Sequence, residues 1–487
     1  MNQRSSVRDL TDVLRSEFDR YPPGAKLPSS RALVERHGVS PVTVSRAIAA
    51  LAAEGLVATR PGSGAFRAVA APAGAAGDTS WQQVTLSADP ATAAGEPVPR
   101  AVDASGVLAT LAAPASGVIA FNGGYLPADL RPERAMAAAL ARAGRRPGAW
   151  ERPPIDGLSE LRGWFAREIG GPGGAIGAAD VLITGGGQSA LAAALRALAP
   201  PGAPVLVESP TYPGMLAIAR ASGMRPVPVP VDTGGIRTDL LADALLATGA
   251  RVLLCQPLFQ NPTGAVLAPE RRGEVLRIAR EAGAFVVEDD FARHLGHADA
   301  AALPPPLAAE DPDGTVVHIR SLTKATSPSL RVGAIAARGP VLRRLRAIQV
   351  VDSFFVPRPL QEAALELVGS PAWGRHLRTV AAGLRERRTA MAAALLDGFP
   401  GLPAPHLPAG GFHLWLRLPD SVEESALAAA ALRAGVAVTP GHSYFPAEPP
   451  GPHLRLSFGE TSGPAEIAEG VRLLRRAFAG LGPANGG

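Results

Sequence analysis

The first 67 residues place apolar side chains at helical spacing in three separate stretches. The spacing predicts helices over residues 7–20, 31–37 and 42–54. Serines directly before the second helix suit an N-cap, and Pro41 suits the first turn of the third helix. The triplets VAT and AFR then flank Arg-Pro-Gly-Ser-Gly at 60–64, which predicts a two-stranded hairpin with a basic, glycine-rich tip.

Beyond about residue 118, short apolar runs alternate with amphipathic stretches of helical period. VLIT precedes QSALAAALRAL, PVLVE precedes GMLAIARA, and RVLLCQP precedes ERRGEVLRIAREAG and then AFVVEDD. Continuous apolar runs are typical of parallel strands buried on both faces, so the pattern predicts an α/β fold with a mostly parallel central sheet flanked by helices. Between the two regions the chain is rich in Ala, Pro and Gly, which indicates a flexible linker. The predicted domains are therefore residues 1–67, 68–117 (the linker) and 118–487.

Composition narrows the class of protein. Of the 487 residues, 47% are hydrophobic and 19% charged, which excludes disorder along the whole length. The single cysteine, Cys255, excludes an intramolecular disulfide framework and multi-thiolate metal sites, and we expect it in the core. No run approaches the roughly 18 apolar residues of a membrane span, and the polar start does not read as a signal peptide. We therefore predict a cytoplasmic protein without a membrane partner.

The amino-terminal region predicts a DNA-binding module. Residues 1–67 carry ten Lys and Arg against six Asp and Glu, an excess that favours a polyanionic partner. Three helices followed by a glycine-rich basic hairpin match a winged helix–turn–helix, whose third helix enters the major groove while the hairpin tip contacts the minor groove. The order LPSSR, VSPVTV, EGLV, RPGSGAF resembles the GntR family of bacterial repressors.

This resemblance implies that double-stranded operator DNA is a partner. Many relatives have Arg where this chain has Pro41, which removes one expected base contact. A helical domain for protein contacts is the alternative. By the resemblance, the residues toward DNA are Lys26, Arg31, Thr43, Ser45 and Arg46, with Gly62, Ser63 and Gly64 at the hairpin tip.

Lysine is almost absent from the chain. Of the 48 Lys and Arg residues only Lys26 and Lys324 are lysines, a bias that GC-rich coding also produces. Arginine remains protonated and cannot perform amine chemistry, whereas a buried lysine with a lowered pKa can form a Schiff base with an aldehyde. Lys324 follows a predicted strand at 316–320, which makes it a candidate for such chemistry.

Other strand ends supply what pyridoxal 5'-phosphate requires. A glycine-rich turn at 184–188 opens a helix, and with Arg331 it suits a phosphate. Asp289 ends an apolar strand and suits the protonated ring nitrogen. Asn261 suits the ring hydroxyl, and Tyr212 suits the ring face. Each signal alone is weak; together they predict a site for this cofactor.

The segments ITGGGQSAL, ESPTYPG, QNPTG, VVEDDF, SLTKATSPSLRVG, AGGFHLWLRLP and HLRLSF, in this order, resemble the fold-type I pyridoxal-phosphate aminotransferases over about residues 118–480. The resemblance implies a PLP-dependent transferase fold with a smaller carboxyl-terminal α+β subdomain, and an aldimine on Lys324. Arg455 would bind a substrate carboxylate; the alternative is an arginine at the rim of an edge strand. The implied cofactor contacts are Lys324, Asp289, Asn261, Tyr212, Gly186, Gly187, Gln188, Ser321 and Arg331.

The chain departs from this family at two positions. Phe291 stands where relatives often have a tyrosine near the aldimine, and Arg152 stands where a tyrosine often contacts the neighbouring subunit's phosphate. Both changes weaken the prediction of robust catalysis more than that of cofactor binding. His294, His297 and His442 lack clustered acidic or thiolate partners in the sequence, so we predict no metal site.

A GntR-type module joined to an aminotransferase-like domain resembles the MocR family of transcriptional regulators. The resemblance implies a domain-swapped homodimer that senses a small amino compound through aldimine chemistry and changes its binding to DNA. Two alternatives stay open at this point. The chain could be a working aminotransferase, with weak or half-reaction activity included, or a sensor of the cofactor itself.

Overall fold

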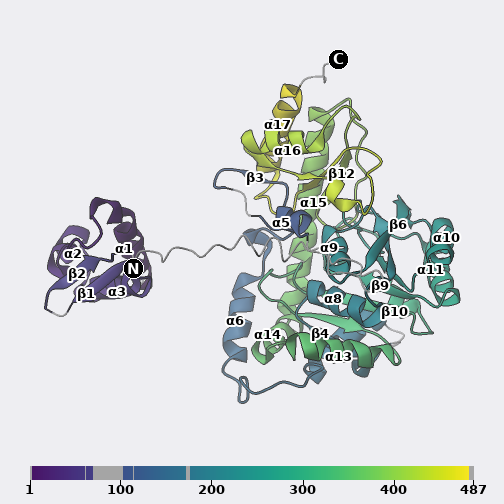
Figure 1. Cartoon of the computed structure of the whole chain (residues 1–487), viewed down its shortest axis with the longest axis horizontal. Helices are drawn as coiled ribbons and strands as arrows, with labels where there is room; N and C mark the ends of the chain where they lie inside the picture. Colours follow the sequence, from purple (N-terminus) through teal and green to yellow (C-terminus); the bar gives the residue numbers. More distant parts are fainter. Residues whose placement is uncertain (1–2, 61, 70–102, 113–114, 172–175, 482–487) are drawn as a thin grey trace, which may run out of the picture. The chain divides into compact units, whose positions relative to one another are not determined.

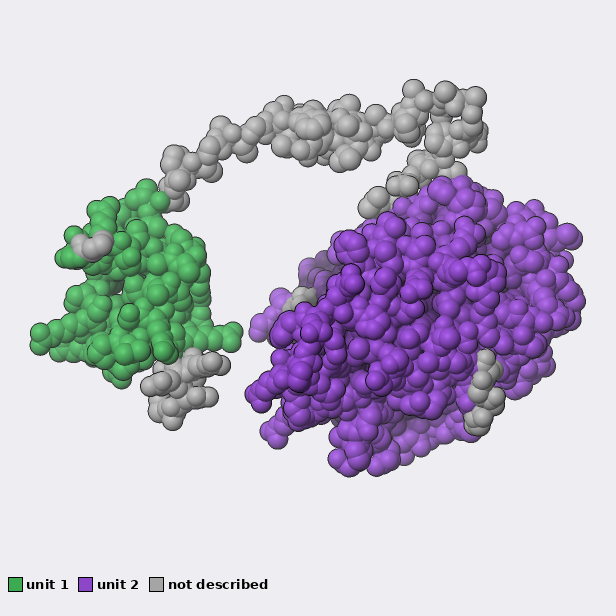
Figure 2. Space-filling view, turned by 90° about the horizontal axis from the view of Figure 1, so that it is seen from below, with its two compact units in different colours: residues 1–91 green, residues 92–487 purple. Residues whose placement is uncertain are grey.

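The computed structural model describes residues 3–60, 62–69, 103–112, 115–171 and 176–481. The chain divides into two compact units, Met1–Ala91 and Thr92–Gly487, which Figure 2 colours separately. Each unit has hydrophobic clusters of its own. Most of the predicted linker, residues 70–102 and 113–114, lies outside the described residues, so its boundaries stay a prediction.

The amino-terminal unit consists of helices followed by a hairpin (Figure 1). The Ser29 hydroxyl accepts from the Ala32 amide, and the Ser40 hydroxyl accepts from the Thr43 amide, so serine N-caps begin both helices of the helix–turn–helix. The hairpin strands are antiparallel. The elements are α1 (Gln3–Glu17), η1 (Phe18–Arg20), α2 (Ser30–His37), α3 (Pro41–Ala53), β1 (Val57–Arg60) and β2 (Gly64–Arg67).

The core of this unit forms where the helical apolar faces meet. Leu33 of α2 packs with Val44 and Ala47 of α3, while Leu51 packs with Val57 of β1. Because these residues recur at helical spacing on α3, the opposite side of this helix is left to solvent.

The large unit is built on an eight-stranded sheet of order β4-β11-β10-β9-β8-β5-β6-β7. Strands β10, β9, β8, β5 and β6 run parallel, β11 runs antiparallel between β4 and β10, and β7 runs antiparallel at the far edge. The bounds are β4 (Val181–Thr184), β5 (Pro204–Ser209), β6 (Arg225–Asp232), β7 (Gly235–Ile236), β8 (Val252–Cys255), β9 (Phe285–Asp289), β10 (Val316–Ser321) and β11 (Gly333–Ala336).

Helices cover both faces of this sheet. In β4, Val181 and Ile183 belong to one apolar cluster and Leu182 to another, as the two-residue period of a strand requires. Helices α7, α10, α11 and α14 contribute to the first cluster, and α8, α9 and α13 to the second. These helices are α7 (Ser159–Gly170), α8 (Gly187–Leu198), α9 (Pro213–Ala221), α10 (Thr238–Thr248), α11 (Pro269–Glu281), α13 (Val341–Ser353) and α14 (Arg358–Val368).

A smaller subdomain has its own cluster around the antiparallel sheet β12-β15-β14. Helix α15 joins it to the large sheet, since Trp373 packs in the large core and Met391 in the small one. Its elements are α15 (Pro371–Gly398), β12 (His413–Arg417), α16 (Glu424–Arg433), β13 (Val436–Ala437), β14 (Thr439–Pro440), η5 (His442–Tyr444), β15 (His453–Ser457) and α17 (Pro464–Gly480).

The first helix that the structure describes in the large unit is short, α5 (Ser105–Leu111), and it contacts α9. This helix falls within the predicted linker. Within the described residues, no helix is both long and apolar enough to cross a membrane. The remaining elements are β3 (Ile119–Ala120), η2 (Ala128–Leu130), α6 (Glu133–Ala143), η3 (Ala178–Asp180), η4 (Arg293–Leu295) and α12 (Leu307–Glu310), with β3 paired to β13.

Candidate functional site

One pocket lies at the carboxyl ends of the central strands. Open α/β sheets bind ligands at this edge, because the loops that follow neighbouring parallel strands converge there. The predicted site residues that line it are Gly187, Gln188, Tyr212, Asn261, Asp289, Ser321, Lys324, Arg331 and Arg455.

Lys324 lines this pocket a few residues after β10 ends. Its ammonium donates to the carbonyl of Gly124 at 2.7 Å and lies 4.0 Å from the centroid of the Tyr125 ring. Burial, and next the positive charge of Arg455, lower the pKa of Lys324 to about 8. About a tenth of the amine is therefore neutral and nucleophilic at pH 7, far more than for an ordinary lysine.

Asp289 faces the pocket from the last position of β9. Its carboxylate accepts a hydrogen bond of 2.7 Å from the Gln256 side chain, and only 4% of the residue is exposed. Burial raises the pKa of Asp289 to about 7, against the opposing effect of that hydrogen bond. A cation placed beside this carboxylate would favour its ionised form, which suits a protonated ring nitrogen.

Asn261 and Tyr212 stand on neighbouring loops of the same edge. The backbone N–H of Asn261 donates to the side-chain oxygen of Gln256 at 3.0 Å. The side-chain Oδ1 of Asn261 is buried and has no hydrogen-bond partner within the described residues. Buried polar atoms are seldom left unpaired, so this atom indicates a missing ligand. The Tyr212 hydroxyl contacts the Gln188 side chain at 3.4 Å, and burial raises its pKa.

The start of α8 forms the phosphate side of the pocket. Gly186 is the N-cap with φ +95°, and a Cβ on it would lie 3.0 Å from the Arg331 guanidinium carbon. Only glycine allows Arg331 to approach the amides of this helix start so closely. The Ser321 hydroxyl is near, bonded to Thr323 at 3.0 Å. A helix N-terminus beside an arginine suits a phosphate group.

Arg455 lies in the middle strand of the small sheet, not at an edge, and is 2% exposed. Its Nη2 donates to the carbonyls of Asn122 at 2.5 Å and Gly123 at 3.0 Å. The Nε atom is buried without a partner among the described residues. A buried guanidinium with an unused donor suits a small carboxylate.

The pocket also contains residues that the sequence analysis missed. Gln256 directly follows the apolar strand β8, so the strand-end rule that selected Asp289 would have found it as well. No motif indicated the other members. Besides Gln256 they are Thr110, Leu111, Gly124, Tyr125, Leu191, Thr323, Phe412 and His413. Taken together, the pocket fits a flat ring with a phosphate, an aldehyde and a protonated nitrogen.

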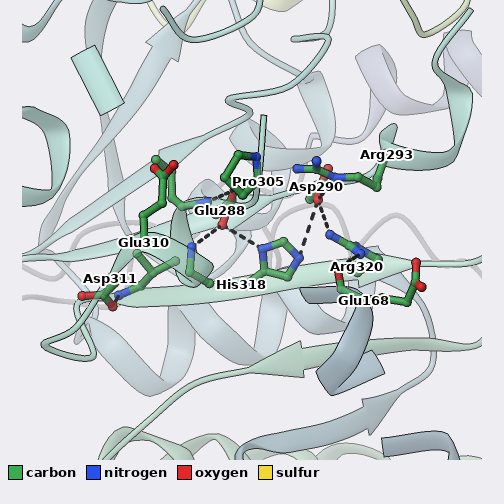
Figure 3. A network of polar contacts seen from close by, with 12 residues as sticks. Glu168, Glu288, Asp290, Arg293, Pro305, Glu310, Asp311, His318 and Arg320 are labelled. Atoms are coloured by element: carbon green, nitrogen blue, oxygen red, sulfur yellow. Dashed lines mark hydrogen bonds and ion pairs between the residues drawn. The ribbon is translucent and has the colours of Figure 1, made fainter. Parts of the chain in front are cut away.

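The residues on either side of Asp289, Glu288 of β9 and Asp290 just after it, belong to a buried charge network (Figure 3). Glu288 bonds His318 Nδ1 at 2.7 Å, and the other ring nitrogen lies 3.7 Å from Asp290. Asp290 accepts from Arg320 at 2.5 Å and from Arg293 at 2.8 Å. Burial alone would raise the pKa of Asp290, but the two arginines outweigh it and hold this pKa well below its usual range.

Phe291 lines the pocket and Arg152 is exposed. Each of the three histidines has a partner of its own: His294 lies 3.6 Å from Glu168, His297 bonds the Gly411 carbonyl, and His442 bonds Glu424. Among the described residues, no cluster of three or more His, Cys, Asp or Glu side chains could hold a metal ion. Cys255 is buried in the core of the large sheet.

In the amino-terminal unit, the predicted DNA-facing residues are exposed, with one exception. Lys26, Arg31 and Arg46 make no ion pair within the described residues, whereas Arg15 pairs with Glu54. Exposed cations that make no ion pair within the protein are available to bind DNA phosphates. The other exposed members are Ser45, Gly62, Ser63 and Gly64.

The exception is Thr43. It is only 6% exposed, and its hydroxyl lies 2.9 Å from the Ser40 hydroxyl at the start of α3. The structure therefore places Thr43 on the buried side of α3 and gives it a part in the helix N-cap rather than a place on the exposed face.

Comparison with known proteins gives matches to both parts of the chain. The family of aminotransferases class I and II matches residues 118–472, and the gntR family of bacterial regulatory proteins matches residues 12–66. A 2-aminoadipate transaminase from Thermus thermophilus is 34% identical over 369 residues, 75% of this chain and 91% of that protein. The transcriptional regulator TauR of Rhodobacter capsulatus is 30% identical over 478 residues, 94% of this chain and 93% of TauR.

Among solved structures, LysN, the α-aminoadipate aminotransferase of Thermus thermophilus, superposes with a TM-score of 0.73 at 32% identity. The match covers 82% of this chain and 99% of LysN, which was solved with N-(5'-phosphopyridoxyl)-L-leucine. These matches confirm the predicted fold class and the pairing of a gntR-type module with an aminotransferase-like domain.

Proposed function

The chain belongs to the aminotransferase class I and II family, and from this premise we propose that it is a transcriptional regulator of the MocR type that depends on pyridoxal 5'-phosphate. The observation that carries the proposal is the presence of a gntR-type module and a lysine-centred pocket in one chain. A transaminase needs no DNA-binding module, whereas TauR, named a transcriptional regulator, matches this chain across both parts.

The pocket residues divide the work of holding the cofactor. When bound, pyridoxal phosphate supplies an aldehyde that can pass between amines and a ring that withdraws electrons. Lys324 offers the neutral amine, since its pKa is about 8. Asp289 holds a proton at the ring nitrogen, and Asn261 bonds the ring oxygen. Arg331 and the start of α8 bind the phosphate, with Gly186, Gly187, Gln188 and Ser321, while Tyr212 covers the ring.

The sensed molecule is a small amine that carries a carboxylate. Arg455 would bind the carboxylate through its guanidinium, which would place the amine of this effector in the same pocket as Lys324. The exposed cations of the amino-terminal unit bind the operator phosphates in a cytoplasmic homodimer with exchanged DNA-binding domains. Because an effector can shift the protein only by binding one state more tightly, occupancy of Arg455 must favour one arrangement of the dimer.

The two lysines give a matched test. We expect purified protein to absorb in the visible range, Lys324→Ala to lose this absorbance, and Lys26→Ala to keep it. In a gel shift with DNA from upstream of the gene, Lys26→Ala should bind more weakly, and Lys324→Ala should no longer respond to cofactor. A colourless wild-type protein, or DNA binding that ignores the cofactor and amino acids, would contradict the proposal.

A working aminotransferase is the second candidate. The convergence of Lys324, Asp289 and Arg455 in one pocket and the 34% identity to a transaminase favour it. Incubation with amino acids and a keto acid tests this possibility. Many turnovers per protein molecule, without specific DNA binding, would establish the enzyme and exclude the regulator.

A further inference from the structure

Three side chains from distant parts of the chain hold one loop beside the pocket, residues 122–125. Arg455 donates to the carbonyls of residues 122 and 123, and Lys324 donates to the carbonyl of residue 124. From the other side, Glu460 Oε1 accepts from the amides of residues 124 and 125, at 3.1 and 3.0 Å. The loop backbone therefore depends on the same arginine and lysine that face the pocket.

The first residue of this loop, Asn122, also holds helix α5. Its side-chain amide donates to the carbonyl of Ala109 at 3.1 Å and to that of Ala112 at 3.2 Å. The last carbonyls of a helix have no partner within the helix, so these bonds satisfy groups that would otherwise be open. Asn122 is 7% exposed, which protects the bonds from competition by water.

Helix α5 lines the pocket and follows, in the sequence, the segment that joins the two units. Thr110 and Leu111 at its end line the pocket. Near its start, a Cβ on Gly106 would lie 3.2 Å from both Pro213 and Ser443, so the helix packs closely on the large unit. Going back along the sequence from residue 103, the next described residues are those of the amino-terminal unit, which end at residue 69.

A carboxylate at Arg455 competes with this arrangement. It would take guanidinium N–H groups, and the Nη2 group is shared by the carbonyls of Asn122 and Gly123. A carboxylate carries a full negative charge and can accept two N–H groups of a guanidinium at once, so it binds the guanidinium more strongly than a neutral carbonyl does. A carboxylate oxygen also repels a carbonyl oxygen placed beside it. Carboxylate binding thus weakens the attachment of Asn122 to Arg455.

We propose that Asn122 is a positioning residue that transmits carboxylate binding at Arg455 to helix α5, and through it to the segment that carries the DNA-binding domain. The proposal rests on the proposed function, because it assumes that the pocket binds a phosphopyridoxyl group and that the protein binds DNA. The proposal adds a physical connection between the two sites: the carbonyl of Asn122 accepts from Arg455, and its side chain donates to the end of α5.

Two ligands separate the carboxylate from the cofactor. N-(5'-phosphopyridoxyl)-L-leucine carries both groups, and pyridoxamine 5'-phosphate has no carboxylate. Each is added to full-length protein freed of cofactor. Hydrogen exchange of the peptide covering residues 103–122 and DNA affinity are then measured. In wild-type protein we expect the leucine adduct to speed exchange in α5 about tenfold relative to pyridoxamine phosphate and to change DNA affinity at least about fivefold.

Asn122→Asp keeps the side-chain shape but removes the donor, and Asn122→Ala removes the group. Both variants should show fast exchange in α5 with either ligand and one DNA affinity for both. Leu108→Ala, on the exposed side of the same helix, should keep the wild-type response. The leucine adduct should still bind each variant, as its absorbance after gel filtration reports.

A ligand-dependent response in both Asn122 variants equal to that of wild type would overturn the proposal, as would equal exchange with the two ligands in wild-type protein. These results would leave the proposed function intact. If instead neither ligand binds, or no DNA is bound, the proposed function fails and the proposal fails with it.

Discussion

The exposed face of the amino-terminal unit and the pocket of the large unit place their cations in opposite surroundings. Lys26, Arg31 and Arg46 lie in solvent without an ion pair among the described residues. Lys324 and Arg455 lie beside one another in the pocket, and Arg455 helps to lower the pKa of the lysine. Solvent screens the exposed cations from one another, whereas burial makes the pKa of each pocket cation depend on the charges near it.

Because of this difference, substitutions on the exposed face should change DNA affinity, and substitutions of the buried charges should change protein stability or the pKa of neighbouring groups. A cation on the exposed face can be removed without leaving an unpaired partner, so its loss should affect DNA binding alone. A charge buried in the pocket or in the network around Asp290 is tied to others, so its loss should change the pKa of those neighbours or the stability of the fold. The following predictions test this contrast, from the largest expected effect to the smallest.

Asp290→Ala should be the most damaging change. It leaves Arg320 buried beside Arg293 without their shared carboxylate, and removal of one partner from a buried pair costs about 3–5 kcal/mol. Urea denaturation of the large unit measures the loss. Glu281→Ala, which breaks an exposed pair with Arg277 in the same unit, is the control and should leave the midpoint unchanged. Equal effects of the two changes would contradict the contrast.

The rate at which cofactor-free protein captures pyridoxal phosphate should rise with pH. Lys324 attacks an aldehyde only when neutral, and its pKa is lowered to about 8, so the rate should increase about fiftyfold from pH 6 to pH 8 and level off above. Stopped-flow absorbance measures this rate. Arg455→Gln removes a positive neighbour and should shift the midpoint to higher pH. A rate that stays flat from pH 6 to pH 8 would argue against a titrating Lys324.

Arg46→Ala should weaken operator binding while leaving the unfolding temperature unchanged. Removing one phosphate or base interaction of the third helix costs about 1–3 kcal/mol, or about five- to 150-fold in affinity. Gel shifts at several salt concentrations measure both the affinity and its salt dependence. Arg15→Ala is the control, because Arg15 already pairs with Glu54. An equal decrease of DNA affinity in the two variants would remove the assignment of the exposed face.

Ser40→Ala should lower the stability of the amino-terminal unit by about 1 kcal/mol, because it removes the N-cap of α3. Thr43→Ala should act in the same direction, since its hydroxyl contacts Ser40. Thermal unfolding measures both changes. Ser45→Ala, at an exposed position, should leave stability unchanged and reduce DNA binding. The opposite result would place Thr43, and not Ser45, at the DNA.

Much of the pocket could be predicted because its chemistry is concentrated at strand ends. Lys324, Asp289 and Asn261 each follow an apolar run, and parallel strands bring such positions to one edge. Tyr125, Glu460 and helix α5 gave no such signal. They come from loops and from the predicted linker, and their roles depend on contacts across more than 300 residues of sequence in the case of Glu460.

The sequence by itself determined the pairing of two modules, the order of their elements and the lysine suited to amine chemistry. Period and composition suffice for this, because helix and strand periods are local and lysine has a chemistry that arginine lacks. Only the tertiary structure decided that Thr43 is buried, that Asp289 and Asp290 acquire opposite pKa shifts, and that Asn122 links Arg455 to α5. These properties arise from burial and from contacts between residues far apart in the sequence, and the local pattern of residues predicts neither.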